Sequence, residues 1–501
     1  TSKVAMAFMG TGIDKLSKLL EFSEHYKKIL PSIFLPTTHG TGSEVTMWGT
    51  IWNMDEKKKY SISHPNLYPD IAILDGNLTL TLPLSVAITT VLDALSHSFE
   101  AIWNKNANNK SSDLAIDAIS TIINNVNYLK EKLGEAGVSW TDFAVAGGGG
   151  ENAMTVLKSR AISGNPPTAA QIKGPSIQEW GNLGFLASID SVAKSNDWDN
   201  LLPGVVSEVM KYKGEYVAAP VNVHRVNWLW ANPEVFRKAG ATIPTTWDDF
   251  MVQAQKIKDA GMIALAHGGQ AWQDATVFEA VVLGVGGPGY YRKAFVELDA
   301  DAINSATTVK VFETFGKLRG FIDSNSPGRD WNVATSMVIN GEAGMQIMGD
   351  WAKGEFKVAG KHVGTDFVCI ASPGSSGSFT FNVDSFAFFS QSDAEKAKAQ
   401  GVMASEILGV DFQRVFNLNK GSIPARLGMA RDEFDSCAHD SMDAFVSSSQ
   451  TGGLVPSFAH GMAVSEAVSG AIYDTATNFF NSKTSAKEGT AQLVKAINAA
   501  K

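Results

Sequence analysis

Cysteine is almost absent from this chain, with two among 501 residues, Cys369 and Cys437. No Cys-x-x-Cys pair exists, which excludes a zinc ribbon and a thioredoxin-like site. Two buried thiols or a single disulfide in an oxidising compartment both fit this composition, and we favour the disulfide.

Long apolar runs and an excess of positive charge are also missing. No window is apolar enough, for long enough, to cross a bilayer, so direct membrane insertion is not expected. The net charge of −9 argues against nucleic acid or an anionic membrane as the main partner. The first residues also lack a basic start followed by an apolar run. A mature secreted protein would have lost such a signal peptide, so the compartment stays open.

What is present describes a globular protein of several domains. A chain of 501 residues is too long for one core, and 44% hydrophobic with 19% charged residues is typical of folded proteins. Strands expected at 168–172, 216–220 and 262–266 alternate with helices at 232–239 and 246–260, which predicts a layered α/β fold. Most of the 12 Trp residues follow residue 127, and Trp often lies where a flat apolar face meets a ligand.

The first part of the chain carries two patterns of chemical interest. A Thr- and Gly-rich loop at 37–43 follows a short predicted strand at 33–35, with another strand expected at 71–74. Such a loop can bring backbone N–H groups and hydroxyls to a phosphate. Asp93 and His97 are four apart in a predicted helix, so they leave one face. The pair fits half of a divalent metal site, or a surface hydrogen bond.

Three phrases give residues 1–127 a resemblance to the iron-dependent (group III) alcohol dehydrogenases: Pro36 to Glu44, Asp75 to Pro83 and Asp93 to Glu100. The resemblance implies contacts to NAD(P) from three threonines, Thr37, Thr38 and Thr41. It also implies two ligands of iron or zinc, Asp93 and His97.

That resemblance is incomplete. The family opens with a nucleotide-binding half carrying a Gly-Gly-Gly-Ser loop, but Phe8 and Met9 stand where glycines belong. It also takes two further His ligands from a helical domain that this sequence lacks. Two ligands do not hold a catalytic divalent metal tightly, so we expect no enzymatic activity and no cofactor. The alternative is a cytoplasmic alcohol dehydrogenase that depends on iron and NAD(P).

Residues 128–501 resemble the glucose/mannose-type solute-binding proteins of bacterial ABC importers. The matching phrases include Ala218 to His224, Ala266 to Gln270, Met348 to Trp351, Asn382 to Phe386 and Lys420 to Arg426. This resemblance implies a two-lobed α/β fold, the type II periplasmic-binding-protein fold, preceded here by a partial dehydrogenase fragment. Two segments would act as hinges, near 220–228 and 381–387, with the ligand between the lobes.

The residue types suit a pyranose, whose apolar faces stack on Trp and whose hydroxyl rim bonds charged and amide groups. The resemblance implies polar contacts from Lys173, Asn382, Asp384, Lys420 and His460, with Gln171 as a further candidate. It implies stacking faces at Trp331 and Trp351, and it places Trp272 and Asp274 near the cleft.

Other polar and aromatic residues of this part are expected to be structural. We assign His224 and His267 to loops near the cleft, Trp228 and Trp230 to the core, and Trp247 to packing at a helix start. Asp350 would cap a turn, and Lys353 would be a solvated surface charge.

The second resemblance lacks a piece too. The family begins with a strand and loop that carry two adjacent Trp residues and a Glu, whereas the matching stretch at 110–127 reads as a helical dehydrogenase phrase. We predict a periplasmic receptor that binds glucose or a related hexose and is recognised by an ABC permease. The alternatives are the dehydrogenase, and an artificial or mis-assembled chimera with neither activity intact.

Overall fold

The computed structural model describes residues 31–34, 46–53, 58–73, 139 and 151–501. The chain divides into two compact units. One consists of residues 1–127 with 140–153, and the other of residues 128–139 with 154–501. The predicted functional boundary at 127/128 stays a prediction. The threonines Thr37, Thr38 and Thr41 and the pair Asp93 and His97 lie outside the described residues, so their proposed cofactor and metal roles also stay predictions.

The described part of the first unit holds two small sheets. Strand β1 (Ile33–Phe34) pairs in parallel with β4 (Ile71–Ala72), so both predicted strands exist. The predicted ends at residues 35 and 74 lie outside the described residues. Strand β2 (Trp48–Asn53) pairs antiparallel with β3 (Lys58–Ser63), and the 3-10 helix η3 (Pro65–Leu67) follows.

The larger lobe of the second unit is built on a four-stranded sheet in the order β11-β12-β10-β13. Its strands are β11 (Ile263–Leu265), β12 (Ala343–Ile347), β10 (Trp228–Ala231) and β13 (Val368–Ala371). β11 and β12 are parallel, while β10 runs antiparallel to both of its neighbours. Every residue of β10 is buried, which explains its continuous apolar sequence.

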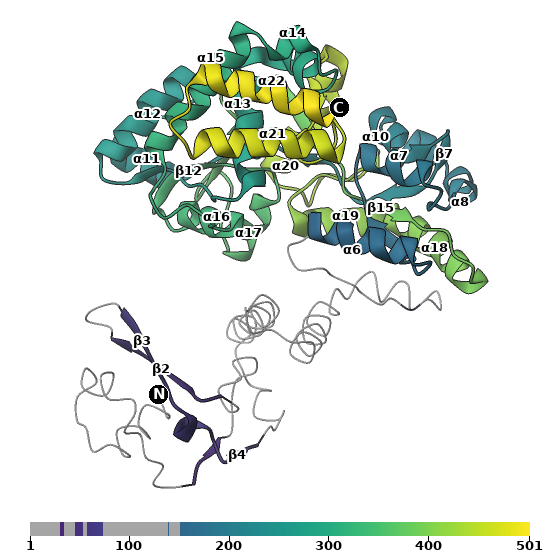
Figure 1. The fold of residues 1–501 in the computed structure, drawn as a ribbon, viewed down its shortest axis with the longest axis horizontal. Coiled ribbons are helices and arrows are strands. Elements are labelled where there is room, and N and C mark those ends of the chain that lie inside the picture. The colour runs from purple at the N-terminus through teal and green to yellow at the C-terminus, as the bar shows by residue number, and fades with distance from the viewer. Residues whose placement is uncertain (1–30, 35–45, 54–57, 74–138, 140–150) are drawn as a thin grey trace. The chain divides into compact units, whose positions relative to one another are not determined.

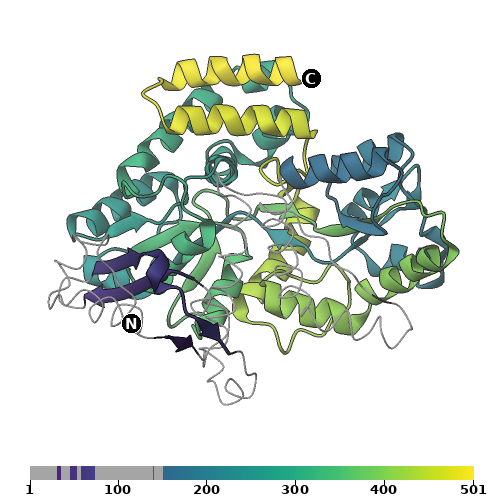
Figure 2. The same ribbon diagram turned by 60° about the horizontal axis from the view of Figure 1, so that its bottom comes forward.

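Helices cover this sheet (Figure 1). They are α11 (Pro233–Ala239), α12 (Trp247–Asp259), α13 (Ala271–Phe295), α14 (Ala300–Ile303), α15 (Ala306–Leu318), η5 (Arg319–Phe321), α16 (Trp331–Ile339), α17 (Ala352–Val358), α21 (Glu466–Phe480) and α22 (Ala486–Ala500). Helix α20 (Ser436–Thr451) instead packs against the strands at 379–382 and 454–456. Helices α21 and α22 run side by side (Figure 2). Helix α12 begins as predicted, since the Thr246 hydroxyl accepts a hydrogen bond from Asp249 N at 3.2 Å.

Two cores lie on this sheet. One gathers Phe, Val, Leu and Ile side chains from α12, α13, α15, α21 and α22. The other contains Trp228, Trp230 and Phe356, which confirms the core assignment of both Trp residues. Cys369 of β13 and Cys437 of α20 belong to the second core and form a disulfide. Trp247 is buried as the first residue of α12, as expected.

The smaller lobe surrounds the sheet β5-β15-β8. Its strands are β5 (Ala169–Gln171), β15 (Ser385–Phe388) and β8 (Ala218–Pro220), with the hairpin β6 (Lys211–Tyr212) and β7 (Glu215–Tyr216) beside them. Its helices are α6 (Glu151–Ile162), α7 (Pro175–Asn182), α8 (Asp190–Ser195), α9 (Trp198–Leu201), α10 (Gly204–Val209), α18 (Ala394–Ile407) and α19 (Val410–Lys420). The predicted strand 216–220 is in fact two strands. Tyr216 belongs to β7 and pairs with Lys211 of the hairpin, whereas Ala218 belongs to β8 and pairs with Ala387 of the sheet.

A third sheet, β16-β14-β9, lies between the lobes. Its strands are β9 (His224–Arg225), β14 (Phe379–Asn382) and β16 (Leu454–Pro456). The chain passes from β8 through β9 to β10, so segment 220–228 connects the two lobe sheets by way of the third sheet. Segment 381–387 leads from β14 of the third sheet into β15 of the smaller lobe. The role of these two segments as hinges stays a prediction.

Candidate functional site

A buried histidine links the larger lobe to the crossing strands. The Nδ1 atom of His224 makes a short hydrogen bond to Asp350, and its Nε2 atom lies 3.1 Å from Asp384 Oδ2. All three residues are buried. Burial disfavours the charged imidazole, but Asp350 and Asp384 outweigh it and raise the pKa of His224. The ring therefore lies between two carboxylates, and Asn222 Nδ2 also approaches its Nε2 atom at 2.9 Å. It lies in strand β9, so the predicted loop position of His224 was wrong.

Asp384 is the centre of this polar cluster. Besides His224, its carboxylate faces Asn382 Nδ2 at 3.4 Å, Asn222 Nδ2 at 3.4 Å and Lys173 Nζ at 3.7 Å. Burial alone would raise the pKa of Asp384, but the charges of Lys173, His224 and Lys420 hold it well below its usual range. The carboxylate is thus ionised although it is buried.

Aromatic rings stand beside the cluster. The indole of Trp351 lies 5.2 Å from the His224 ring and 4.9 Å from the His460 ring, measured between centroids. Trp272 lies 6.1 Å from His460. Trp272, Trp331 and Trp351 are all half-buried and pack against the same core. Trp272 and Trp351, which share His460 as a ring neighbour and are neither buried nor exposed, suit a ligand with flat apolar faces.

His460 approaches the cluster from the loop after β16. Its Nε2 atom lies 3.1 Å from the Thr276 hydroxyl. Burial and the charges of Lys173 and His224 push the pKa of His460 well below 6.5, so this imidazole is neutral. A neutral imidazole can both donate and accept a hydrogen bond, as a sugar hydroxyl requires.

Two buried oxygens of predicted sugar residues have no hydrogen-bond partner among the described residues, Asn382 Oδ1 in the cluster and Asp274 Oδ2 on α13. The other Asp274 oxygen lies 2.7 Å from His267 Nε2, which fits the structural role expected for His267. Because buried polar atoms in proteins are almost always paired, these two oxygens are acceptors that suit a ligand rich in hydroxyl donors.

The remaining predicted residues lie at the edge of the cluster. Gln171 is exposed on β5, where its backbone pairs with Phe386. Lys420 is the exposed last residue of α19, and it acts on Asp384 through its charge.

Two structural assignments were wrong. Lys353 is not a solvated surface charge, because it is buried and its Nζ atom lies 3.0 Å from Asp435. Asp350 does more than cap a turn. Its second oxygen accepts a hydrogen bond from Arg225 N at 2.8 Å while the first faces His224. Asp350 and Lys353 both face groups far away in the sequence, which a local pattern does not reveal.

Asn222 and His224 are members of the site that the sequence analysis missed. The signal that could have found them is their spacing of two residues at the start of strand β9, which puts both side chains on one side of the chain. Asn222 Oδ1 also accepts a hydrogen bond from Asp384 N at 3.0 Å, so it fixes the backbone of the central carboxylate.

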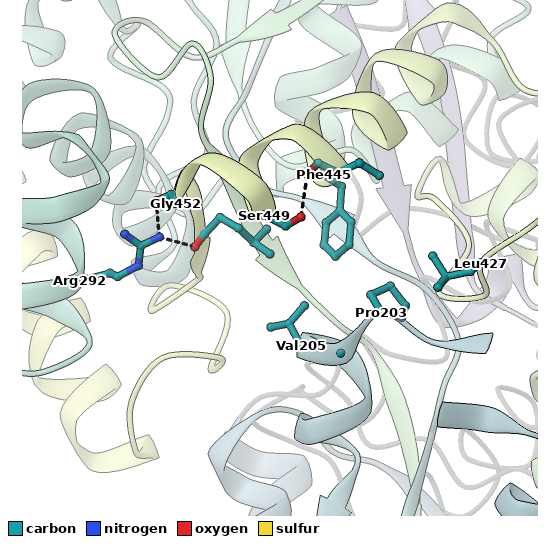
Figure 3. A pocket seen from close by; sticks show the side chains of 10 residues that line it. Pro203, Val205, Arg292, Leu427, Phe445, Ser449 and Gly452 are labelled. Carbon is teal, nitrogen blue, oxygen red and sulfur yellow. Dashed lines mark hydrogen bonds between the residues drawn. The ribbon is translucent and has the colours of Figure 1, made fainter. Parts of the chain in front are cut away.

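A cavity of about 430 Å³ lies elsewhere, between α10 and α20 (Figure 3). Its lining is mostly apolar and includes Pro203, Val205, Leu427 and Phe445. At one end, one guanidinium nitrogen of Arg292 donates hydrogen bonds to the carbonyl oxygens of Gly452 and Leu454, so this nitrogen already has partners within the protein. None of the ten predicted sugar residues lines this cavity.

Titration of His224 gives a test of the buried cluster. Because its folded pKa is raised above 6.5, the histidine stabilises the fold fully below that pH, and this contribution is lost as pH rises through the folded pKa. We expect the wild type to have a larger free energy of unfolding than His224→Gln. This difference should be largest in mild acid and should shrink toward alkaline pH. Urea denaturation at several pH values measures it. A difference that stays constant with pH would contradict the raised pKa of His224.

Comparison with known proteins places the geometry in a family. The family model of the bacterial extracellular solute-binding proteins matches residues 144–404. The chain belongs to this family. The "probable sugar-binding periplasmic protein" of Brucella suis biovar 1 (strain 1330) is 47% identical over 376 residues, covering 75% of this chain and 89% of the relative. That of Rhizobium meliloti (strain 1021) is 46% identical over 376 residues, covering 75% and 90%.

Solved structures share the fold of this solute-binding protein. A chitin oligosaccharide binding protein superimposes with a TM-score of 0.65 at 16% identity, over 76% of this chain and 96% of the other. The bacterial solute receptor AcbH, which prefers β-D-galactopyranose, superimposes with a TM-score of 0.63 at 17% identity, over 74% of this chain and 93% of the other. These likenesses confirm the two-lobed type II fold.

The N-terminal resemblance is confirmed as well. The family model of the iron-containing alcohol dehydrogenases matches residues 1–76. The "probable alcohol dehydrogenase EutG" of Salmonella typhimurium is 40% identical over 119 residues, 24% of this chain and 30% of that relative. The chain thus spans less than a third of that dehydrogenase.

Within the described residues, no group of three or more His, Cys, Asp or Glu side chains could hold a metal ion. The same residues contain no helix long and apolar enough for a membrane span.

Proposed function

We propose that this solute-binding protein is the periplasmic receptor of an ABC importer and that it binds a hexose, glucose or a related monosaccharide, between its lobes. The observation that carries the proposal is the meeting of an ionised Asp384, Lys173 and Asn382 with the indole of Trp351 and the imidazole of His460. A ring with apolar faces and a rim of hydroxyls uses both kinds of group.

The roles follow from the chemistry of each group. Asp384 and the unpaired Asn382 Oδ1 accept hydrogen bonds from hydroxyls, and Lys173 donates to a hydroxyl oxygen. Trp351 covers one face of the ring, and Trp272, Trp331 and Asp274 border the same space. Gln171 and Lys420 lie at the rim, where they would contribute less than the buried groups.

Three further points support this reading. The curated relatives carry sugar-binding, periplasmic names. The disulfide between Cys369 and Cys437 suits an oxidising compartment such as the periplasm. In a two-lobed receptor, closure around the ligand creates the form that a membrane permease distinguishes from the open one.

The ligand panel is the first experiment. The full chain is titrated calorimetrically with D-glucose, D-mannose, D-galactose, maltose and chitobiose. We expect a hexose to bind with a Kd below about 100 μM, which corresponds to roughly 5.5 kcal/mol. A disaccharide that binds much more tightly than every monosaccharide would refute the hexose size. No heat with any sugar at millimolar concentration would refute the receptor itself.

A further inference from the structure

A buried carboxylate with no assigned role lies on helix α13. Glu279 accepts hydrogen bonds from Tyr291 Oη at 2.6 Å, Ser457 Oγ at 2.7 Å, Phe458 N at 2.6 Å and Ala459 N at 3.0 Å. Four donors on one buried carboxylate are far more than chance placement supplies, and three of them come from one loop.

A break in α13 makes this arrangement possible. Tyr291 follows Glu279 by twelve residues, which is about 18 Å along a straight helix. The helix is interrupted at Gly287, whose φ of 73° favours glycine, and Pro288 follows. The second half therefore turns back, and the Tyr291 hydroxyl reaches Glu279 while lying 2.8 Å from the Pro456 carbonyl oxygen.

The loop held by Glu279 is the one that carries His460. Thr276 lies one turn before Glu279 on the same helix face, and its hydroxyl contacts His460 Nε2. On the outer side, the Tyr473 hydroxyl donates to the Ala459 carbonyl oxygen at 2.7 Å. One face of α13 thus holds both the backbone of the loop and its imidazole.

We propose that Glu279 is a positioning residue that fixes the loop 457–460, so that His460 faces Trp351 and Trp272 with a sugar between the lobes. This inference rests on the proposed sugar-binding function. Glu279 touches no ligand itself. It acts by reducing the conformational freedom of the loop. The entropy of ordering His460 is then lost on folding and not on sugar binding.

Burial raises the pKa of Glu279 to about 7, against the donors that favour its charge. The titratable groups that face it are Tyr291 and Tyr473, and burial raises the pKa of both above 10. Glu279 is therefore the group of this cluster that changes charge near neutral pH. Glu279→Gln imitates its protonated form, so the wild type should gain sugar affinity over this variant as pH rises through about 7.

A matched pair of tyrosines provides the test. Tyr291→Phe removes the hydroxyl that braces Glu279, while Tyr290→Phe removes the neighbouring hydroxyl, which lies 2.7 Å from Thr308 instead. Each variant keeps its ring, but Tyr291→Phe also loses the contacts of this hydroxyl to Pro456 O and Phe458 N, so thermal unfolding of both variants separates lost folding from lost binding. We expect glucose affinity to fall about fivefold in Tyr291→Phe and by less than twofold in Tyr290→Phe.

Amide hydrogen exchange of Phe458 and Ala459 reads the loop without any sugar. We expect about fivefold faster exchange of these amides in Tyr291→Phe and in Glu279→Gln than in Tyr290→Phe. Equal exchange in all three variants, or equal sugar affinity in the two tyrosine variants, would overturn the proposal. A wild type that binds no sugar would refute the receptor function alone, and the exchange measurement would still decide whether Glu279 fixes the loop.

Discussion

Replacing Asp384 with Asn should lower glucose affinity about 100-fold, roughly 3 kcal/mol. The change keeps the shape of the side chain but removes the charge that Lys173 and His224 face. Hydrogen bonds from sugar hydroxyls to an ionised carboxylate are stronger than those to an amide oxygen, so the loss should exceed that of a neutral contact. Calorimetric titration of both proteins with the hexose that binds the wild type gives the ratio.

Asp199→Asn is the matched control, because this carboxylate also faces a lysine, with Lys211 Nζ at 2.8 Å, but belongs to α9 of the smaller lobe. Its sugar affinity should stay within twofold of the wild type. Thermal unfolding of both variants separates lost folding from lost binding. If Asp384→Asn bound glucose as well as Asp199→Asn did, Asp384 would not be a ligand contact.

Removing the indole of Trp351 should weaken glucose binding about 30-fold, roughly 2 kcal/mol, because a stacked aromatic face is a typical hot spot. Trp351→Ala deletes this face, and Trp351→Phe should recover part of the affinity. Since Trp351 is half-buried, a loss of stability accompanies the change, and unfolding curves must be recorded with each titration.

Gly349→Ala tests the position of the same indole without deleting it. A methyl group at Gly349 would lie 2.2 Å from the Trp351 ring, so the indole must move. We expect at least a fivefold loss of affinity. Gly470→Ala in α21 is the control, since its methyl group meets nothing within 4 Å. Unchanged binding by Gly349→Ala would show that this face does not contact the sugar.

Much of the candidate site could be predicted because its residues lie in phrases characteristic of the family. Asp384 and Asn382 come from one phrase and Trp351 from another, and the structure brings them to one cluster with His460 and Lys173. Helix starts such as Thr246 were also predictable, since a cap and its acidic first turn are local features.

Other properties could not be predicted, because they depend on contacts between residues far apart in the chain. His224 faces Asp350 across 126 positions, and this contact raises the pKa of a buried imidazole. Lys353 faces Asp435 across 82 positions, which turns an expected surface charge into a buried one. Glu279 meets Ser457 across 178 positions, so nothing near it in the sequence marks its role.

The sequence by itself determined that two unrelated families meet in this chain, that the second part folds as a two-lobed α/β protein, and which side chains are candidates to bind a sugar. Motifs and periodicity carry that information because they are written in neighbouring residues. Only the tertiary structure decided which groups are ionised, which are buried, and which carboxylate holds the His460 loop. Charge and burial depend on what lies within a few ångströms in space, and the fold brings those groups together from distant parts of the chain.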